Sequence, residues 1–289
     1  MKYLPQQVRR LEITTRGLVE DLAAGDYASA FRGRGVEFEE VREYFPGDDV
    51  RTIDWNVTAR LGNPHVKRFR EERQLTLLLL VDISASGHFG SGTRTKRELA
   101  AELAAVLTLS ATRHRDRIGA LLYSDRVEWF TPPRSGRSQA LAIMDRVLGH
   151  EPVGRGTDLV RALEYLDPLL RRRVVIGVIS DFLDPDQWQA LERLAPRHDA
   201  IAFRVTDPRE ALLPDIGLAT LTDPETGRWR VVDLADRTVR AALQSGWTDL
   251  ERRFEARCRT RGIDLVNLAT DRPYAETLMG FFRRRARVG

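Results

Sequence analysis

The chain from about residue 74 onward alternates between short apolar runs and segments with apolar residues every three or four positions. The runs are of strand length, and those at 75–82, 173–181 and 199–207 are continuous enough to be covered on both faces of a sheet. Further strands are predicted at 116–124, 127–132 (an antiparallel edge) and 262–268, with a hairpin around 223–229. Helices are predicted at 95–114, 137–148, 157–170, 236–257 and 272–284. This alternation predicts an α/β fold, a doubly wound and mainly parallel sheet with helices on both faces.

The first 73 residues have a different pattern. Residues 5–24 predict a helix, while 30–73 contain glycines, turns and short alternating segments that predict a small β-rich appendage. We therefore expect two parts, residues 1–73 and residues 74–289. In the segment 44–62, aspartates and arginines interleave around Trp55. We expect an arginine–carboxylate network that holds the appendage on the main domain with Trp55 as a buried anchor; direct partner binding is the alternative.

Composition narrows the class of protein. Hydrophobic residues make up 42% of the chain and charged residues 30%, as in a soluble globular protein. No apolar run approaches the roughly 20 residues that cross a bilayer, and the first residues do not resemble a signal peptide. The single cysteine, Cys258, excludes an intrachain disulfide. These features predict a cytoplasmic protein without a membrane span.

The charge pattern does not predict a nucleic-acid partner. The net charge is +4, from 46 basic and 42 acidic residues that are interspersed along the chain. Nucleic-acid binders usually show a basic stripe without matching acids. The one concentrated basic cluster, in the tail "FFRRRARVG" at 281–289, is expected to be a solvated helix end, with contact to an anionic surface as the alternative.

Oxygen-bearing side chains from three segments of the chain are predicted to lie at one edge of the sheet. Asp82, Ser84 and Ser86 follow the first central strand, Asp181 follows another, and Thr157 stands at the start of a helix. Ligands of such sheets bind beyond the carboxyl ends of the strands. Hydroxyls and carboxylates are the hard donors that Mg²⁺ takes, about six of them in octahedral geometry. Together these residues predict a divalent-metal site, with Mg²⁺ as the ion and Mn²⁺ or Ca²⁺ as alternatives.

Taken singly, each of these residues has an ordinary structural role. Thr157 alone would be a helix N-cap, and Asp82 or Asp181 alone would be a turn residue at a strand end. The convergence of three segments on one edge favours the metal site. One or two carboxylates together with neutral hydroxyls do not fully balance the two positive charges of a divalent ion. An open coordination position would therefore attract an acidic group from another molecule.

Several stretches of the chain resemble two known protein families. The stretches "DISAS" at 82–86, "GTDL" at 156–159 and "ISDF" at 179–182 resemble the three loops of the metal-ion-dependent adhesion site of von Willebrand factor A (vWA) domains. The segment "YFPGDDVRTIDWNVTARLG" at 44–62 is similar to the one that defines the DUF58 family, in which it precedes a vWA-like domain. "DPRE" at 207–210 and "LTDPETGRWRVVD" at 221–233 agree with that family.

The resemblance implies a function and roles for the five residues. Ser84 and Ser86 would coordinate the ion directly, and Asp82, Thr157 and Asp181 directly or through water. Relatives are thought to work with MoxR-type AAA+ ATPases as adaptors in maturation, metal insertion or assembly of other proteins. The expected partner is therefore such an ATPase, or a client protein, held through an acidic residue.

Two other functions remain as alternatives. An aspartate-dependent phosphohydrolase would need an acid/base carboxylate two residues after Asp82, where this chain has Ser84. Of the three lysines, only Lys96 is near the site in sequence as a phosphate-binding candidate. We therefore do not expect an enzyme. The second alternative is a vWA-like scaffold without a working metal site.

Overall fold

The computed structural model describes residues 4–22, 27–31, 36–71 and 74–288. Its body is a six-stranded sheet in the order β10-β7-β6-β3-β4-β5, in which only β5 is antiparallel to its neighbour. The strands of this sheet have the following bounds: β3 Thr76–Asp82, β4 Arg117–Tyr123, β5 Val127–Arg134, β6 Val175–Ser180, β7 Asp199–Thr206 and β10 Asp264–Ala269. The α/β prediction and its antiparallel edge are confirmed.

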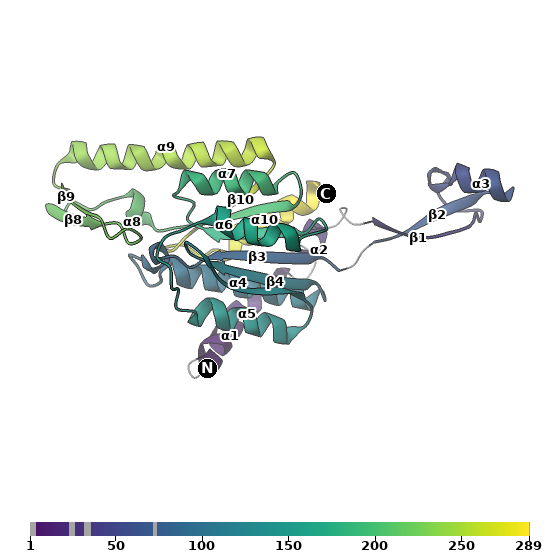
Figure 1. Ribbon diagram of the computed structural model, residues 1–289, viewed down its shortest axis with the longest axis horizontal. Helices are drawn as coiled ribbons and strands as arrows, with labels where there is room; N and C mark the ends of the chain where they lie inside the picture. Colours follow the sequence, from purple (N-terminus) through teal and green to yellow (C-terminus); the bar gives the residue numbers. More distant parts are fainter. Residues whose placement is uncertain (1–3, 23–26, 32–35, 72–73, 289) are drawn as a thin grey trace.

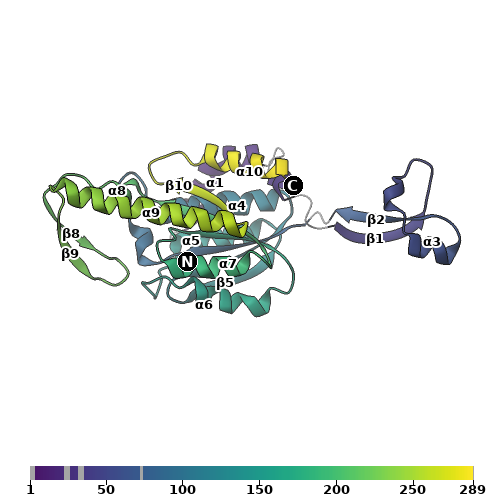
Figure 2. The same cartoon turned by 90° about the horizontal axis from the view of Figure 1, so that it is seen from above.

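Helices cover both faces of the sheet, as Figures 1 and 2 show. The longer ones are α1 Leu4–Asp21, α4 Lys96–Arg113, α5 Arg137–Gly149, α6 Leu159–Leu166, α7 Pro185–Leu194, α9 Arg237–Arg261 and α10 Ala275–Val288. No helix was predicted from the sequence over the residues of α7. This helix begins after the N-cap Asp184 and buries Trp188, whose indole nitrogen donates a hydrogen bond of 2.8 Å to the carbonyl of Phe182.

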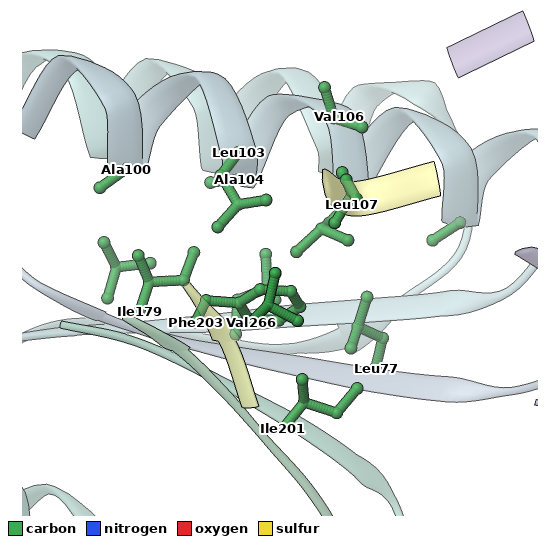
Figure 3. Packing of buried hydrophobic residues seen from close by; sticks show 14 of the residues in the cluster. Leu77, Ala100, Leu103, Ala104, Val106, Leu107, Ile179, Ile201, Phe203 and Val266 are labelled. Atoms are coloured by element: carbon green, nitrogen blue, oxygen red, sulfur yellow. The ribbon is translucent and has the colours of Figure 1, made fainter. Parts of the chain in front are cut away.

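Successive side chains of β3 point to opposite faces of the sheet, and the core therefore has two layers. Leu77, Leu79 and Val81 pack with α4, α5 and α10 on one face, and Leu78 and Leu80 pack with α6, α7 and α9 on the other. Figure 3 shows α4 lying over the first of these layers. A strand buried on both faces must be apolar throughout, which explains the leucine run. The run ends only where β3 leaves the core, at Asp82.

The N-terminal helix packs on the main body. Val8 and Leu11 of α1 lie against Ala105 of α4 and Met144 of α5. Tyr27 of the short helix α2 (Tyr27–Ala30) belongs to the core layer that α4, α5 and α10 cover. The described residues 4–22 and 27–31, which were predicted from the sequence to belong with the appendage, thus contribute to the core of the α/β body.

The appendage is an antiparallel hairpin with a helix at its tip. Strands β1 (Val36–Glu43) and β2 (His65–Glu71) pair with each other, and the short helices η2 (Val50–Thr52) and α3 (Trp55–Leu61) lie between them. It projects away from the body in both views (Figures 1 and 2). The prediction of short strands is confirmed, but the prediction of a buried Trp55 is wrong, because this side chain is 69% exposed.

The arginine–carboxylate pair of the appendage is internal. Arg42 donates two hydrogen bonds, of 2.9 and 2.7 Å, to the two carboxylate oxygens of Asp48. Asp54 caps α3 by accepting from the backbone N–H groups of Asn56 and Val57. These contacts shape the tip of the hairpin rather than attach it to the body.

The C-terminal arginine cluster is partly internal. Arg285 of α10 forms ion pairs with Asp199 and Asp264 and lies over the ring of Phe31. Phe281 and Phe282 of the same helix are buried in the core. The prediction of a solvated helix end is therefore wrong for Arg285.

Candidate metal site

The candidate site lies at the carboxyl edge of the sheet, between β3 and β6. From β3 the chain passes to β4 on one side, and β6 joins β3 on the other, so the strand order reverses here. Such a switch point leaves a crevice beyond the strand ends. Asp82 ends β3 and Asp181 directly follows β6.

Four of the five predicted residues are linked by hydrogen bonds. Ser84 Oγ lies 3.0 Å from Ser86 Oγ, and Ser86 Oγ donates to Asp181 Oδ2 at 3.0 Å. The backbone N–H of Ser84 donates to Asp82 Oδ1 at 2.9 Å, and Ser180 Oγ donates to Asp82 Oδ2 at 2.7 Å. Both oxygens of Asp82 are thus already hydrogen-bonded.

The loop of the fifth residue, Thr157, lies beside the first loop. The backbone N–H of Ala85 donates to the carbonyl of Arg155 at 3.0 Å. Thr157 Oγ1 itself donates to Glu225 Oε1 at 2.8 Å. Thr157 is therefore joined to the other four through its loop, while its own hydroxyl pairs with Glu225, a residue with no role predicted from the sequence.

Backbone geometry after β6 fixes the direction of Asp181. Phe182 has φ of 54°, the left-handed region that a bulky residue rarely adopts. Its ring is buried and stacks on Phe254 at 4.8 Å, which holds the backbone in place. Core packing therefore supports an unfavourable backbone conformation next to the candidate ligand.

A buried lysine enters the same cluster. Lys96, at the start of α4, is 3% exposed, and its Nζ donates to Asp181 Oδ2 at 2.7 Å and to Glu210 Oε1 at 2.5 Å. Burial lowers the pKa of Lys96, but the charges of Asp181 and Glu210 outweigh it and raise that pKa above its ordinary value. The ammonium group therefore stays charged and balances part of the negative charge of the site.

Burial and like charge act on the carboxyl groups. Burial, followed by the charge of Asp181, raises the pKa of Asp82 to about 7, against the hydrogen bonds from Ser180 and Ser84. Burial also raises the pKa of Glu225, and the charge of Asp181 adds to this, while the hydroxyls of Thr157 and Ser84 lower it. Lys96 offsets part of this negative charge, and the remaining carboxylate charge favours a bound cation.

The spacing of the oxygens is compatible with a bound magnesium ion as well as with the hydrogen bonds that join them. Neighbouring ligands of an octahedral ion with bonds of about 2.1 Å lie about 3.0 Å apart. This is the separation of Ser84 Oγ from Ser86 Oγ and of Ser86 Oγ from Asp181 Oδ2. A cavity of about 20 Å³ lies beside them, lined in part by Asp82, Ser86, Lys96 and Asp181, and has room for one water molecule or ion.

The hydroxyl donors are essential to this interpretation. Among the residues that the structure describes, no group of three histidine, cysteine, aspartate or glutamate side chains is arranged to hold a metal. The donor set is therefore the mixed one that the sequence predicts. That these residues bind a metal stays a prediction.

The acid at the end of β7 has a structural role. Asp207 accepts hydrogen bonds from the backbone N–H and the hydroxyl of Ser91 and from the hydroxyl of Thr270. It also caps the short helix α8 (Pro208–Ala211), whose Glu210 reaches back to the Asp207 N–H. Asp207 thereby fixes Glu210 where it contacts Lys96.

Comparison with known proteins identifies the family. A family model described as "protein of unknown function DUF58" matches residues 40–253. The chain is 36% identical to an uncharacterized protein of Mycobacterium tuberculosis over 98% of its own length and 90% of that protein. It is 42% identical over 66 residues, 22% of this chain and 63% of the other, to an uncharacterized Paracoccus denitrificans protein from the moxR 3′ region.

Solved structures of similar fold include vWA domains. One is the vWA domain of SpRpn10, at 9% identity and a TM-score of 0.38, covering 71% of this chain and 94% of that one. Another is an aerotolerance-related membrane protein from Bacteroides fragilis, at 14% identity and a TM-score of 0.48, covering 74% and 100%. The body of the chain is an α/β domain with a mainly parallel six-stranded sheet.

The same comparison corrects the prediction of a cytoplasmic protein. A structure of similar fold is described as a membrane protein, and another as an uncharacterized membrane-spanning protein from Vibrio fischeri. The cytoplasmic prediction is therefore withdrawn. Within the described ranges, every helix is too short or too polar to cross a bilayer.

Proposed function

The chain belongs to the DUF58 family, and from this premise we propose that it is a protein-binding adaptor whose metal site grips an acidic residue of a partner. Ser84 and Ser86 would hold the ion directly, with Asp82, Thr157 and Asp181 acting directly or through water. The ion would supply the positive charge that a carboxylate of the partner requires. The observation that carries the proposal is that the hydroxyls of Ser84 and Ser86 and the carboxylate of Asp181 come together at the strand ends.

The proposed partner is an AAA+ ATPase of the MoxR type or one of its client proteins. Support for this choice comes from the similar Paracoccus denitrificans protein, which is described as lying in the moxR 3′ region. The role of the chain would be non-enzymatic, since the site offers hydroxyls and carboxylates suited to holding an ion. Mg²⁺ is the proposed ion, and Mn²⁺ is the more convenient probe.

A thermal shift experiment tests the metal site. Mg²⁺ or Mn²⁺ at about 100 times its dissociation constant stabilises a protein by about 2.7 kcal/mol, and each kcal/mol corresponds to roughly 2–4 °C in Tm for a chain of this size. We expect a rise of about 5–10 °C for the wild type. Asp82→Ala and Asp181→Ala should abolish the rise. Asp249→Ala, which alters an exposed acid on α9, is the control and should retain it.

Capture from the native lysate tests the adaptor role. Wild-type protein should retain a MoxR-type ATPase in the presence of Mg²⁺ and release it on chelation, and Asp82→Ala should not retain it. Capture that is indifferent to chelator would contradict the metal-bridged contact. Asp82-dependent hydrolysis of a generic phosphomonoester would instead favour the phosphohydrolase alternative.

A further inference from the structure

The hairpin β8–β9 inserts one acidic side chain into the candidate metal site. Strands β8 (Leu218–Thr222) and β9 (Trp229–Asp233) pair with each other, and Glu225 lies in the turn between them. Glu225 is half-buried, whereas the turn residues on either side of it are exposed. Its Oε1 accepts the hydrogen bond of 2.8 Å from Thr157 Oγ1.

The surroundings of Glu225 are the site residues themselves. Burial and the charge of Asp181 raise the pKa of its carboxyl group, while the hydroxyls of Thr157 and Ser84 lower that pKa. Glu225 Oε2 also lies 3.8 Å from the point where a Cβ on Gly156 would stand. A carboxylate from a distant part of the chain thus lies between the first loop and the Thr157 loop.

The turn that carries Glu225 is locally well defined. Asp223 Oδ1 accepts from the backbone N–H of Glu225 at 2.9 Å, and Asp223 Oδ2 accepts from Thr226 Oγ1 at 2.6 Å. Gly227, with φ of 70°, closes the turn through a hydrogen bond from its N–H to the carbonyl of Asp223. The turn therefore presents Glu225 in one direction.

The rest of the hairpin has few buried side chains. Leu218, Trp229 and Val231 are 75%, 69% and 52% exposed, and they share one face of the hairpin by their pairing register. Little apolar burial therefore holds the two strands on the body, and the hydrogen bond of Glu225 to Thr157 is a main polar contact of the turn.

We propose that Glu225 takes, within the chain itself, the position at the metal that the proposed function gives to a partner's acid. The inference rests on that proposed function. In the free protein the ion would be held by Glu225 together with the loop residues. A partner would bind by supplying its own carboxylate while the β8–β9 turn moves away. Glu225 then competes with the partner's carboxylate for the same position at the ion, so that only a partner that binds the ion more strongly displaces it.

Metal binding and the hairpin are coupled if this proposal holds. Without an ion, the negative charge of Asp181 repels the carboxylate of Glu225. A dication at the site would attract both carboxylates. Adding Mn²⁺ should therefore slow hydrogen exchange of the backbone amides of residues 220–230 in the wild type. The matched control is Asp233→Asn, which removes a charge from the same hairpin at an exposed acid whose carboxylate accepts from Ala235 N–H.

The test compares Mn²⁺ titrations and hydrogen exchange for four proteins. We expect Glu225→Gln to weaken Mn²⁺ binding by at least about tenfold and to remove the protection of the hairpin, and Asp233→Asn to behave as the wild type. Glu225→Ala leaves room for a small acid, so added acetate should strengthen Mn²⁺ binding in this variant and not in the wild type.

The outcomes separate the two proposals. If Mn²⁺ binds the wild type and depends on Asp82, but Glu225→Gln binds equally well and the hairpin exchange is unchanged, the role of Glu225 is refuted and the metal site stands. If the wild type does not bind Mn²⁺ at all, the proposed function itself fails. Equal effects of acetate on the wild type and on Glu225→Ala would also refute the role of Glu225.

Discussion

At the scale of single residues, burial decides the charge of a carboxyl group far from the candidate site. Asp116 precedes β4 and is 2% exposed, and one of its oxygens accepts a hydrogen bond of 2.9 Å from the backbone N–H of Leu75. Burial raises the pKa of Asp116 to about 6, from an ordinary value of 3.8. The native state therefore holds a proton on this group more tightly than the unfolded state does.

This pKa predicts a pH dependence of stability. Because the folded pKa is the higher one, the contribution of Asp116 is favourable below pH 3.8 and is lost as the pH rises through about 6. Asp116→Asn keeps an acceptor for Leu75 and removes the buried charge. It should raise the free energy of unfolding at pH 8 by about 1–3 kcal/mol and have a much smaller effect at pH 4. Urea unfolding at both pH values measures this, and an equal effect at both would contradict it.

From the sequence one could predict which residues come together at the candidate site, but not which side chains they contact there. Asp82, Ser84, Ser86 and Asp181 are recognisable because each follows a strand whose apolar pattern gives its position in the sheet. Glu225 is not recognisable in this way, since its contact with Thr157 spans 68 residues and depends on how the hairpin docks. Lys96 was noted only as a phosphate-binding candidate; its ion pair with Asp181 spans 85 residues. No local pattern encodes such a contact.

At the scale of elements, the loop that carries Thr157 is fixed by a close approach at Gly154. A Cβ added there would lie 2.3 Å from both Asp125 Oδ1 and Ser124 Oγ. The Gly154 N–H also donates to Glu128 Oε1 at 2.8 Å, and Ser124 Oγ donates to the same oxygen at 2.6 Å. The loop is therefore packed against the end of β4 without room for a side chain.

Gly154→Ala should displace this loop. We expect a loss of about 1–3 kcal/mol in unfolding free energy, the usual cost of overpacking, together with weaker binding of any ion that Thr157 helps to hold. The matched control is Gly246→Ala in α9, where an added Cβ has no neighbour within 4 Å. That variant should gain up to about 1 kcal/mol from helix propensity. A Gly154→Ala protein as stable as the wild type would show that the loop can shift freely.

At the scale of the whole molecule, the appendage and the candidate site lie at opposite edges of the sheet. Strand β2 ends at Glu71, shortly before β3 begins at Thr76, and β3 ends at Asp82 in the site. The appendage therefore projects from the amino end of β3, as Figure 1 shows. Phe45, Val50, Trp55 and Leu61 on it are each more than 60% exposed.

The body should fold without the appendage. None of the described residues 41–66 belongs to the core clusters of the body, and the contacts of Arg42 and Asp54 given above are internal to the appendage. Replacing residues 36–71 by a short glycine–serine linker should leave the thermal transition of the body within a few degrees of the wild type. Circular dichroism melting tests this. Loss of the cooperative transition would show that the appendage stabilises the sheet.

Two tryptophan substitutions compare how much a side chain of the appendage and one of the body contribute to stability. Trp55→Ala should change the unfolding free energy by less than about 0.5 kcal/mol, because the side chain is 69% exposed. Trp188→Ala should cost about 3–5 kcal/mol, because that side chain is 1% exposed between α7 and the sheet. Equal costs would mean that Trp55 is buried in solution.

The burial of Cys258 has a practical consequence for labelling. This thiol is 2% exposed, and burial raises its pKa to about 12. At neutral pH it is neither accessible nor ionised, so thiol reagents should leave the native protein unmodified. A cysteine introduced at an exposed position would then be the one that reacts. Fluorophores or spin labels placed on the β8–β9 turn and on the tip of the appendage could follow the movement of each against the body, with the natural cysteine left in place.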